Sequence, residues 1–166
     1  MKLDRRAFLA FGGAAIVGGV AFTLPGRQPP VPPGPTRRFP LQMTDAEWRQ
    51  RLSPEQYYVL RQAGTERPGS SPLNAEHRRG TFLCAGCGQP LFASETKFES
   101  GTGWPSFYRP LPNAVTNAED RTLIEARTEV LCARCGGHLG HVFDDGPSPT
   151  GLRYCMNGVA LTFRPA

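Results

Sequence analysis

Two pairs of cysteines constrain the fold of this chain more than any other feature of its sequence. Each pair has the spacing C-x-x-C and is followed directly by glycine; the pairs are Cys84 with Cys87 and Cys132 with Cys135. Four thiolates complete the tetrahedral shell of a zinc ion and leave no open position for a substrate. We therefore expect one structural four-cysteine zinc site joining two distant segments, with each glycine letting the backbone turn tightly around the ion.

The same cysteines allow other interpretations. They could form two disulfides, or one pair could be a redox-active C-x-x-C. Four thiolates also bind iron, and the spacing does not distinguish iron from zinc. Of these, the spacing favours a structural zinc ion as the cofactor.

A fifth cysteine, Cys155, is left without a partner in this pattern, in the segment RYCMN at residues 153–157. If this segment is a strand, Arg153, Cys155 and Asn157 share one face. Arg153 would then favour the thiolate and lower the pKa of Cys155, and Asn157 could orient a reacting group. The alternatives are a small buried apolar cysteine and an arginine that only pairs with a surface acid.

Two further segments carry candidate groups. His138 and His141 follow the second cysteine pair, and four cysteines already saturate zinc, so we interpret both histidines as free of metal. His141 is the stronger candidate for donating a proton to a leaving oxygen, and a buried, hydrogen-bonded histidine is the alternative. Residues 101–107 predict a loop that presents Trp104 and Phe107 to a small apolar substrate pocket, with a plug in the core as the alternative for Trp104.

The N-terminal segment, residues 1–24, is typical of an export signal. A basic start precedes an uncharged stretch at residues 7–24, and the sequence RRAFL at residues 5–9 matches the twin-arginine export motif. We predict export to the periplasm or another extracytoplasmic space. An ordinary secretory signal and a membrane tether through residues 7–24 are the alternatives.

Residues 25–40 contain seven prolines and predict an extended spacer, which leaves residues 41–166 as the folded domain. The formal net charge of the chain is +5. Removal of residues 1–24 would leave 16 basic and 13 acidic residues, and a zinc ion with four thiolates would lower the charge by about two. The domain is then close to neutral, and no basic stripe indicates nucleic-acid binding.

The pattern within residues 41–166 predicts two short helices and then a mainly β, mostly antiparallel structure. Capping boxes begin at Thr44 and Ser53, and Gly64 is expected to end the second helix. Short apolar or alternating runs between turn residues predict the strands. These strands are expected at residues 81–85, 90–93, 123–127, 129–133, 142–143, 152–155 and 159–163.

Several segments together closely resemble the type B methionine sulfoxide reductases. Besides the two cysteine pairs, they are QAGTERP at 62–68, GTGWPSF at 101–107, HLGHVFDDGP at 138–147 and RYCMN at 153–157. The resemblance spans about residues 44–164. It implies a β-tent-like fold of two small antiparallel sheets with short N-terminal helices and a structural zinc. It also implies reduction of the R epimer of methionine S-oxide, mainly in proteins.

The resemblance further implies roles for single residues. Cys155 matches the nucleophile that attacks the sulfoxide sulfur and is left as a sulfenic acid. Trp104 matches the residue that packs on the substrate methyl group. His141 and Asn157 match two polar groups around the reacting atoms, and Arg153 matches an arginine that favours the thiolate. His138 belongs to the same motif and is expected to contact the substrate.

Two positions depart from the family pattern. Thr102 stands where many members carry a second cysteine that resolves the sulfenic acid, and Gly158 stands where serine is frequent, so a local hydrogen bond is expected to be missing. Because Thr102 cannot resolve the sulfenic acid, we predict that a thioredoxin-like protein or a small thiol attacks the oxidised Cys155 directly. We also expect the protein to be a monomer that acts on oxidised proteins. The alternative from another class is a non-catalytic, zinc-stabilised β domain that binds a ligand or partner.

Overall fold

The computed structural model describes residues 38–121 and 126–166. The predicted export signal at residues 1–24 lies outside this range, as does most of the predicted spacer at residues 25–40. Within the described ranges, no helix has the length and apolar character that a membrane span requires.

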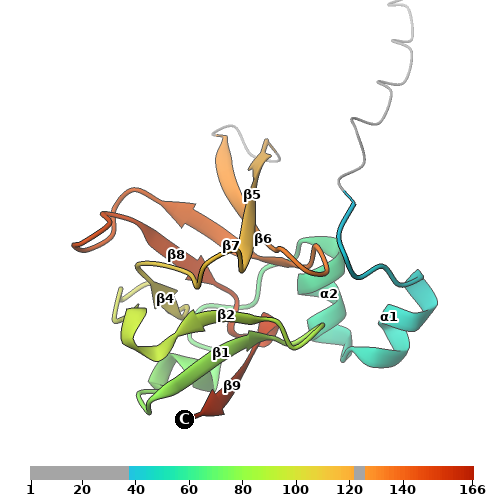
Figure 1. Ribbon diagram of the computed structural model, residues 1–166, viewed down its shortest axis with the longest axis horizontal. Coiled ribbons are helices and arrows are strands. Elements are labelled where there is room, and N and C mark those ends of the chain that lie inside the picture. The colour runs from blue at the N-terminus through green and yellow to red at the C-terminus, as the bar shows by residue number, and fades with distance from the viewer. Residues whose placement is uncertain (1–37, 122–125) are drawn as a thin grey trace, which may run out of the picture. The chain divides into compact units, whose positions relative to one another are not determined.

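Two short helices open the described part of the chain, α1 (Asp45–Arg51) and α2 (Pro54–Gln62), and they lie together at one side of the domain (Figure 1). Both predicted capping boxes are present: each N-cap hydroxyl accepts the N3 backbone N–H, and the N3 side chain accepts the N-cap N–H in return. The predicted starts of both helices are therefore confirmed. Helix α2 is capped by Ala63 in the left-handed conformation, one residue before the glycine that we expected to end it.

The strands form two antiparallel sheets, as predicted. The first has the order β2-β1-β9, and the second has the order β3-β4-β8-β7-β6-β5. The strands are β1 (Gly80–Cys84), β2 (Pro90–Ala93), β3 (Lys97–Phe98), β4 (Ser106–Phe107), β5 (Val115–Asp120), β6 (Arg127–Cys132), β7 (His138–Phe143), β8 (Arg153–Met156) and β9 (Leu161–Pro165). The described residues also form three 3₁₀ turns: η1 (Pro72–Ala75) before β1, η2 (Ser94–Thr96) between β2 and β3, and η3 (Gly158–Ala160) between β8 and β9.

Three of these strands were not predicted. β3 and β4 have two residues each, too few for a periodic pattern, so the predicted loop at residues 101–107 in fact ends in β4. β5 is an edge strand of mostly polar residues without apolar alternation. The predicted strand at 123–127 falls mainly outside the described residues, and β9 begins later than predicted because residues 158–160 form η3.

Aromatic rings from both sheets meet in the core. Phe92 of β2 stacks on Phe107 of β4 with a centroid distance of 4.3 Å, and Phe82 of β1 meets Phe107 edge-on at 4.9 Å. Phe92 also contacts Tyr154 of β8 at 5.9 Å. Because such contacts add to the burial of large apolar surfaces, this cluster fixes the position of β4 and β8 against the first sheet.

Strand β8 lies between β4 and β7, and the register places Cys155 opposite one residue of each. Cys155 on β8 is opposite Ser106 on β4 and opposite His141 on β7. Gly140 allows β7 and β8 to approach closely: its φ is 155°, and a Cβ there would overlap the carbonyl oxygen of Cys155. The fold therefore places one histidine of the HLGH motif directly across the ladder from the leftover cysteine.

Candidate active site and metal centre

The four paired cysteines lie together at one point of the fold. Their sulfur atoms are all within 4.8 Å of one another, and all four residues are buried. Two contacts join one pair to the other, at 3.8 Å for Cys84–Cys135 and 3.5 Å for Cys87–Cys132. A tetrahedral ion bound at about 2.3 Å would separate its sulfur ligands by about 3.8 Å, so the four residues fit one zinc ion. The four thiols are free in this structure, and the cluster of all four favours the metal site over two disulfides.

Two equivalent turns shape this centre at the ends of β1 and β6. Gly88 donates its N–H to the carbonyl of Cys84, Gly136 does the same to Cys132, and both glycines have a positive φ, 74° and 68°. The tight turns predicted from the glycines are therefore present. The four thiols share protons: hydrogen bonds among them raise the pKa of Cys84 and Cys135 and lower the pKa of Cys87 and Cys132. A bound divalent cation would stabilise all four as thiolates.

Cys155 is half-buried on the wall of a cavity of about 120 Å³. The wall is built from the loop after α2, the loop before β4, and strands β6, β7 and β8 with the residue that follows β8. The lining residues are Thr65, Trp104, Arg127, Gly140, His141, Phe143, Cys155 and Asn157. Four residues that were candidates from the sequence thus meet here: Trp104, His141, Cys155 and Asn157.

Phe107 does not join them, and its predicted role as a pocket residue is corrected. Its side chain is fully buried, with 0% exposure, in the aromatic core. On β4 neighbouring residues point to opposite faces, so Ser106 shares the face of Cys155 while Phe107 shares the face of Tyr154. The loop therefore contributes one aromatic side chain to the cavity and one to the core.

Both histidines of the HLGH motif are bonded to carboxylates. His141 Nε2 lies 2.8 Å from Oδ2 of Asp120, which also accepts a hydrogen bond from Arg127 at 2.7 Å. His138, only 3% exposed, lies outside the cavity lining with its Nδ1 at 2.6 Å from Glu129, so its predicted contact with the substrate is corrected to a buried hydrogen bond. The contact with Asp120 leaves Nδ1 of His141 for a substrate. Burial lowers the pKa of His141 below its ordinary value, and the hydrogen bond to Asp120 opposes this change.

The pKa of Cys155 moves in the opposite direction from the one expected. Burial raises the pKa of the Cys155 thiol, while a hydrogen bond from Thr102 and the charge of Arg153 act against that rise. Arg153 also contacts two other residues: its guanidinium forms two 2.8 Å hydrogen bonds to Asp145 and lies 4.4 Å from the centroid of the Phe143 ring. Arg153 therefore acts in the predicted direction, but burial outweighs its charge, and the pKa of Cys155 in the free protein lies above its ordinary value.

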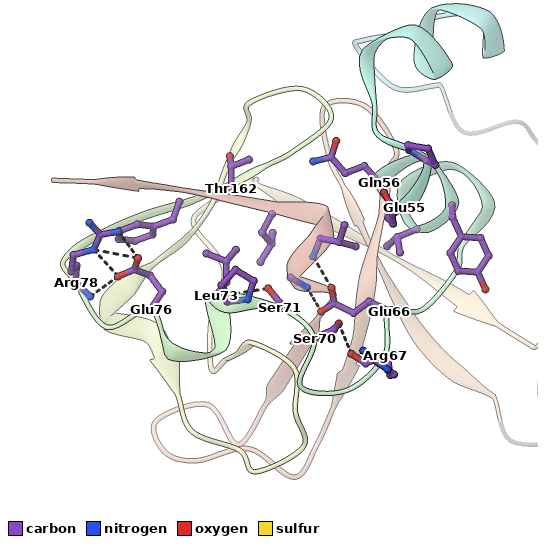
Figure 2. Close-up of a pocket in the computed structure, with 18 residues that line it drawn as sticks. Glu55, Gln56, Glu66, Arg67, Ser70, Ser71, Leu73, Glu76, Arg78 and Thr162 are labelled. Atoms are coloured by element: carbon purple, nitrogen blue, oxygen red, sulfur yellow. Dashed lines mark hydrogen bonds and ion pairs between the residues drawn. The ribbon is translucent and has the colours of Figure 1, made fainter.

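Glu66 is a central residue of the site to which sequence analysis assigned no role. Its backbone N–H donates to Asn157 Oδ1 at 2.9 Å, and its carbonyl accepts from the Trp104 indole at 3.2 Å. Its carboxylate accepts the backbone N–H groups of Gly158 and Val159 at 2.6 and 2.8 Å, as the dashed lines in Figure 2 show. One residue thus holds both Trp104 and Asn157. The QAGTERP segment carried the resemblance, and its glutamate was the signal that could have pointed to this role.

The residues that bond to the two histidines or to their carboxylate partners do not belong to any sequence motif. Asp120, Glu129 and Arg127 come from β5 and β6, where the sequence shows neither a metal pattern nor a nucleophile pattern. Only the strand pairing of β5, β6 and β7 brings their side chains to the two histidines.

A larger hollow of about 1040 Å³ lies between α2, η1 and β9 (Figure 2). Glu66 is part of its wall, but neither Cys155 nor the two histidines of the HLGH motif line it. We therefore place the candidate active site in the smaller cavity, which contains the half-buried thiol.

The structure also accounts for Gly158. A Cβ at this position would overlap the side chain of Ser71, so a serine here would require Ser71 to move. The backbone N–H of Gly158 is already bonded to Glu66. Ser71 thus occupies the space that the serine side chain expected at position 158 would take.

Comparison with known proteins gives a consistent result. Residues 52–165 match the family model described as the SelR domain. A protein of Agrobacterium fabrum is 55% identical over 123 residues, covering 74% of this chain and 91% of the relative. Proteins of Methanosarcina barkeri (55% identical, 75% of this chain, 88% of the relative) and Thiobacillus denitrificans (57%, 74% and 93%) are similar. All three relatives are named peptide methionine sulfoxide reductase MsrB.

Proposed function

Because the chain belongs to the SelR domain family, we propose that it is a peptide-methionine (R)-S-oxide reductase, an oxidoreductase that returns oxidised methionine in proteins to methionine. One observation carries the proposal for this chain. A half-buried free thiol, Cys155, shares a cavity of about 120 Å³ with an indole, an imidazole and a carboxamide. This set provides a nucleophile, an apolar wall, a proton donor and an orienting group.

The side chain of methionine sulfoxide combines an apolar methyl group with a polar S–O bond, and the cavity offers both kinds of surface. Trp104 is held by its indole hydrogen bond to Glu66 and supplies the apolar wall for the methyl group. Asn157 is only 4% exposed and is fixed at both ends of its amide, by Glu66 N–H and by the carbonyl of Leu139. These fixed groups orient the sulfoxide sulfur toward Cys155.

In the chemical step, the thiolate of Cys155 attacks the sulfoxide sulfur, and the sulfur–oxygen bond of the substrate is broken. The oxygen is protonated, with His141 Nδ1 as the proton donor because Asp120 holds Nε2. The attack joins the Cys155 sulfur to the substrate sulfur, and the protonated oxygen leaves as hydroxide. Hydroxide then attacks the Cys155 sulfur and breaks this sulfur–sulfur bond, so the substrate leaves as methionine, reduced by two electrons. Cys155 is oxidised by two electrons to a sulfenic acid.

We propose that an external thiol restores the enzyme. Thr102, the residue 3.9 Å from the Cys155 sulfur, carries a hydroxyl and cannot form a disulfide. The other four cysteines make up the metal centre. A first thiol therefore attacks the sulfenic acid and releases water, and a second thiol attacks the mixed disulfide, giving back the Cys155 thiol and an oxidised disulfide of the reductant.

Zinc, held by Cys84, Cys87, Cys132 and Cys135, would be structural in this proposal. With four sulfur ligands the ion has no open position, so it supplies folding free energy and no Lewis-acid chemistry. The centre joins the end of β1 to the end of β6, and so fastens the first sheet to the second.

Turnover of the two sulfoxide epimers tests this function. The purified zinc-loaded chain should reduce the R epimer of a blocked methionine sulfoxide with dithiothreitol and leave the S epimer unchanged. Cys155→Ser should abolish turnover while keeping the circular dichroism spectrum and the zinc content. Full turnover by Cys155→Ser would remove Cys155 as the nucleophile, and a folded wild type without turnover would favour the non-catalytic binding domain.

For cellular location, we propose export by the twin-arginine route, on the motif at residues 5–9. Replacement of Arg5 and Arg6 by lysine should retain the protein in the cytoplasm when the precursor is followed by cell fractionation. Continued appearance of the double variant in the periplasmic fraction would contradict this route.

A further inference from the structure

A chain of three hydroxyl groups runs from the sulfur of Cys155 to the backbone. Thr102 Oγ1 lies 3.9 Å from Cys155 Sγ and 2.8 Å from Ser100 Oγ. Ser100 Oγ is in turn 2.8 Å from Ser106 Oγ, and Ser106 reaches the carbonyl oxygen of Trp104 at 3.2 Å. The chain is partly sheltered: Ser106 is 1% exposed, on the strand directly opposite Cys155.

Each hydroxyl has a single hydrogen, so the chain has two complete arrangements. In the first, Ser106 donates to Ser100, Ser100 donates to Thr102, and Thr102 donates to the sulfur. In the second, every hydroxyl has rotated: Thr102 donates to Ser100, Ser100 to Ser106, and Ser106 to the carbonyl of Trp104. The oxygen of Thr102 is then free to accept the S–H of Cys155.

The two arrangements suit the two protonation states of Cys155. A thiolate has no hydrogen and needs a donor, which the first arrangement provides. A neutral thiol needs an acceptor, which the second provides, and its last hydrogen ends on a carbonyl rather than on an unpaired group. No proton leaves the chain in the exchange, because each hydroxyl only rotates.

We propose that Thr102, supported by Ser100 and Ser106, is a positioning residue that stabilises the Cys155 thiolate through this reversible hydroxyl chain. The inference rests on the proposed function only in taking Cys155 as the reacting thiol. It deepens that function by assigning a role to the position where many relatives carry a second cysteine. In a cavity where burial opposes the thiolate, a polarised chain of donors offsets part of that opposition.

The other charged or titratable groups near the sulfur are Arg153 with its partner Asp145, and His141 and Arg127 on the cavity wall. They are unchanged in variants of the hydroxyl chain. A difference in the titration of Cys155 between such variants therefore reports on the hydroxyls.

The experiment measures the rate of alkylation of Cys155 by iodoacetamide against pH, in the zinc-loaded chain, with the modified peptide quantified by mass spectrometry. Thr102→Val keeps the shape of the side chain and removes the hydroxyl, and it should move the midpoint upward by about one pH unit. Thr102→Ser should keep the wild-type midpoint. Thr65→Val, the same change elsewhere on the cavity wall, should also keep it. An unchanged midpoint in Thr102→Val, or an equal rise in Thr65→Val, would overturn the proposal.

Two further variants complete the test. Thr102→Ala removes the hydroxyl with less bulk and serves if the valine variant does not fold, with the same expected rise of the midpoint. Ser100→Ala leaves Thr102 in place but cuts the chain, so its midpoint should lie between those of wild type and Thr102→Val. If Ser100→Ala keeps the wild-type midpoint, Thr102 alone stabilises the thiolate, and the proposed role of the hydroxyl chain is wrong. The alkylation rate needs no turnover, so an inactive wild type would contradict the proposed function without affecting this measurement.

Discussion

The backbone N–H of Glu66 donates a 2.9 Å hydrogen bond to the side-chain oxygen of Asn157, across 91 positions of sequence. The same glutamate fixes the Trp104 indole through its carbonyl and the backbone of residues 158–159 through its carboxylate. Trp104 and Asn157 come from different segments, and Glu66 is the residue that sets their separation. The geometry of the cavity therefore depends on a residue outside its lining.

Glu66→Gln tests this dependence. An amide has one acceptor oxygen for two backbone N–H donors, so at least one N–H of residues 158–159 loses its partner. The resulting displacement of Asn157 and Trp104 should lower kcat/KM by about 10²-fold, because small misplacements of positioning groups cost that much. The free energy of unfolding should fall by about 1–3 kcal/mol, measured by urea denaturation.

Glu76→Gln is the matched control. Glu76 also lines the larger hollow, but its carboxylate bonds to the exposed Arg78 (Figure 2). Its replacement should leave kcat/KM within about twofold, since its carboxylate bonds to Arg78 and not to the segments that hold Trp104 and Asn157. Equal losses in both variants would show that Glu66 has no special connection with the cavity.

The parts of the fold that could be predicted are those set by local chemistry or by a fixed ligand count. The helix starts follow from hydroxyl caps at Thr44 and Ser53, and the metal centre follows from four cysteines at zinc spacing. Phe107 was misplaced because the face of a two-residue strand depends on its register with β8, which the sequence does not display. Similarly, the pKa of Cys155 depends on burial, and burial is a property of the packed chain.

The pH dependence of kcat/KM should be bell-shaped. His141 acts protonated with a pKa below its ordinary 6.5, and Cys155 acts deprotonated with a pKa above its ordinary 9.0. The product of the two reactive fractions rises up to the histidine pKa, is constant between the two values, and falls above the thiol pKa. The acid limb should therefore lie below pH 6.5 and the alkaline limb above pH 9.0.

The variant Asp120→Asn tests whether His141 is the group that titrates in the acid limb of the kcat/KM profile. The hydrogen bond to Asp120 raises the pKa of His141, so its loss should move the acid limb to lower pH. The plateau should fall about tenfold for each pH unit that the limb moves. Asp145→Asn is the comparison, because Asp145 acts on Cys155 and should move only the alkaline limb, toward lower pH. An acid limb that stays in place in Asp120→Asn would remove His141 as the group that titrates there.

Thr102→Cys should change the way the enzyme is restored. The hydroxyl of Thr102 lies 3.9 Å from the Cys155 sulfur, within reach of a disulfide after a small adjustment. Reaction of this variant with substrate in the absence of reductant should give a 102–155 disulfide, mapped by peptide mass analysis. The wild type should instead give one sulfenic acid at Cys155, trapped by dimedone. A Cys155 disulfide to any other cysteine of the wild-type chain would contradict direct attack by an external thiol.

Removal of the metal should unfold the domain rather than only lower its rate of turnover. Structural zinc contributes about 10–16 kcal/mol in small zinc domains, comparable with the whole stability of a domain. Cys84→Ser and prolonged chelation should therefore both abolish the cooperative thermal transition seen by circular dichroism. Cys155→Ser, outside the metal centre, should keep the transition and one bound ion by elemental analysis. A folded Cys84→Ser protein without metal would refute the structural role of the centre.

Variants of Phe107, on β4, and of Trp104, in the loop before β4, should distinguish effects on stability from effects on substrate binding. Phe107→Ala opens a hole in the aromatic core between Phe82 and Phe92, and should lower the free energy of unfolding by about 3–5 kcal/mol. The fraction that remains folded should keep its KM, because Phe107 does not line the cavity. Trp104→Ala should show the reverse, a higher KM with a smaller loss of stability, since its indole is only partly buried. Parallel urea denaturation and steady-state kinetics measure both, and a raised KM in Phe107→Ala at full folding would return Phe107 to the binding site.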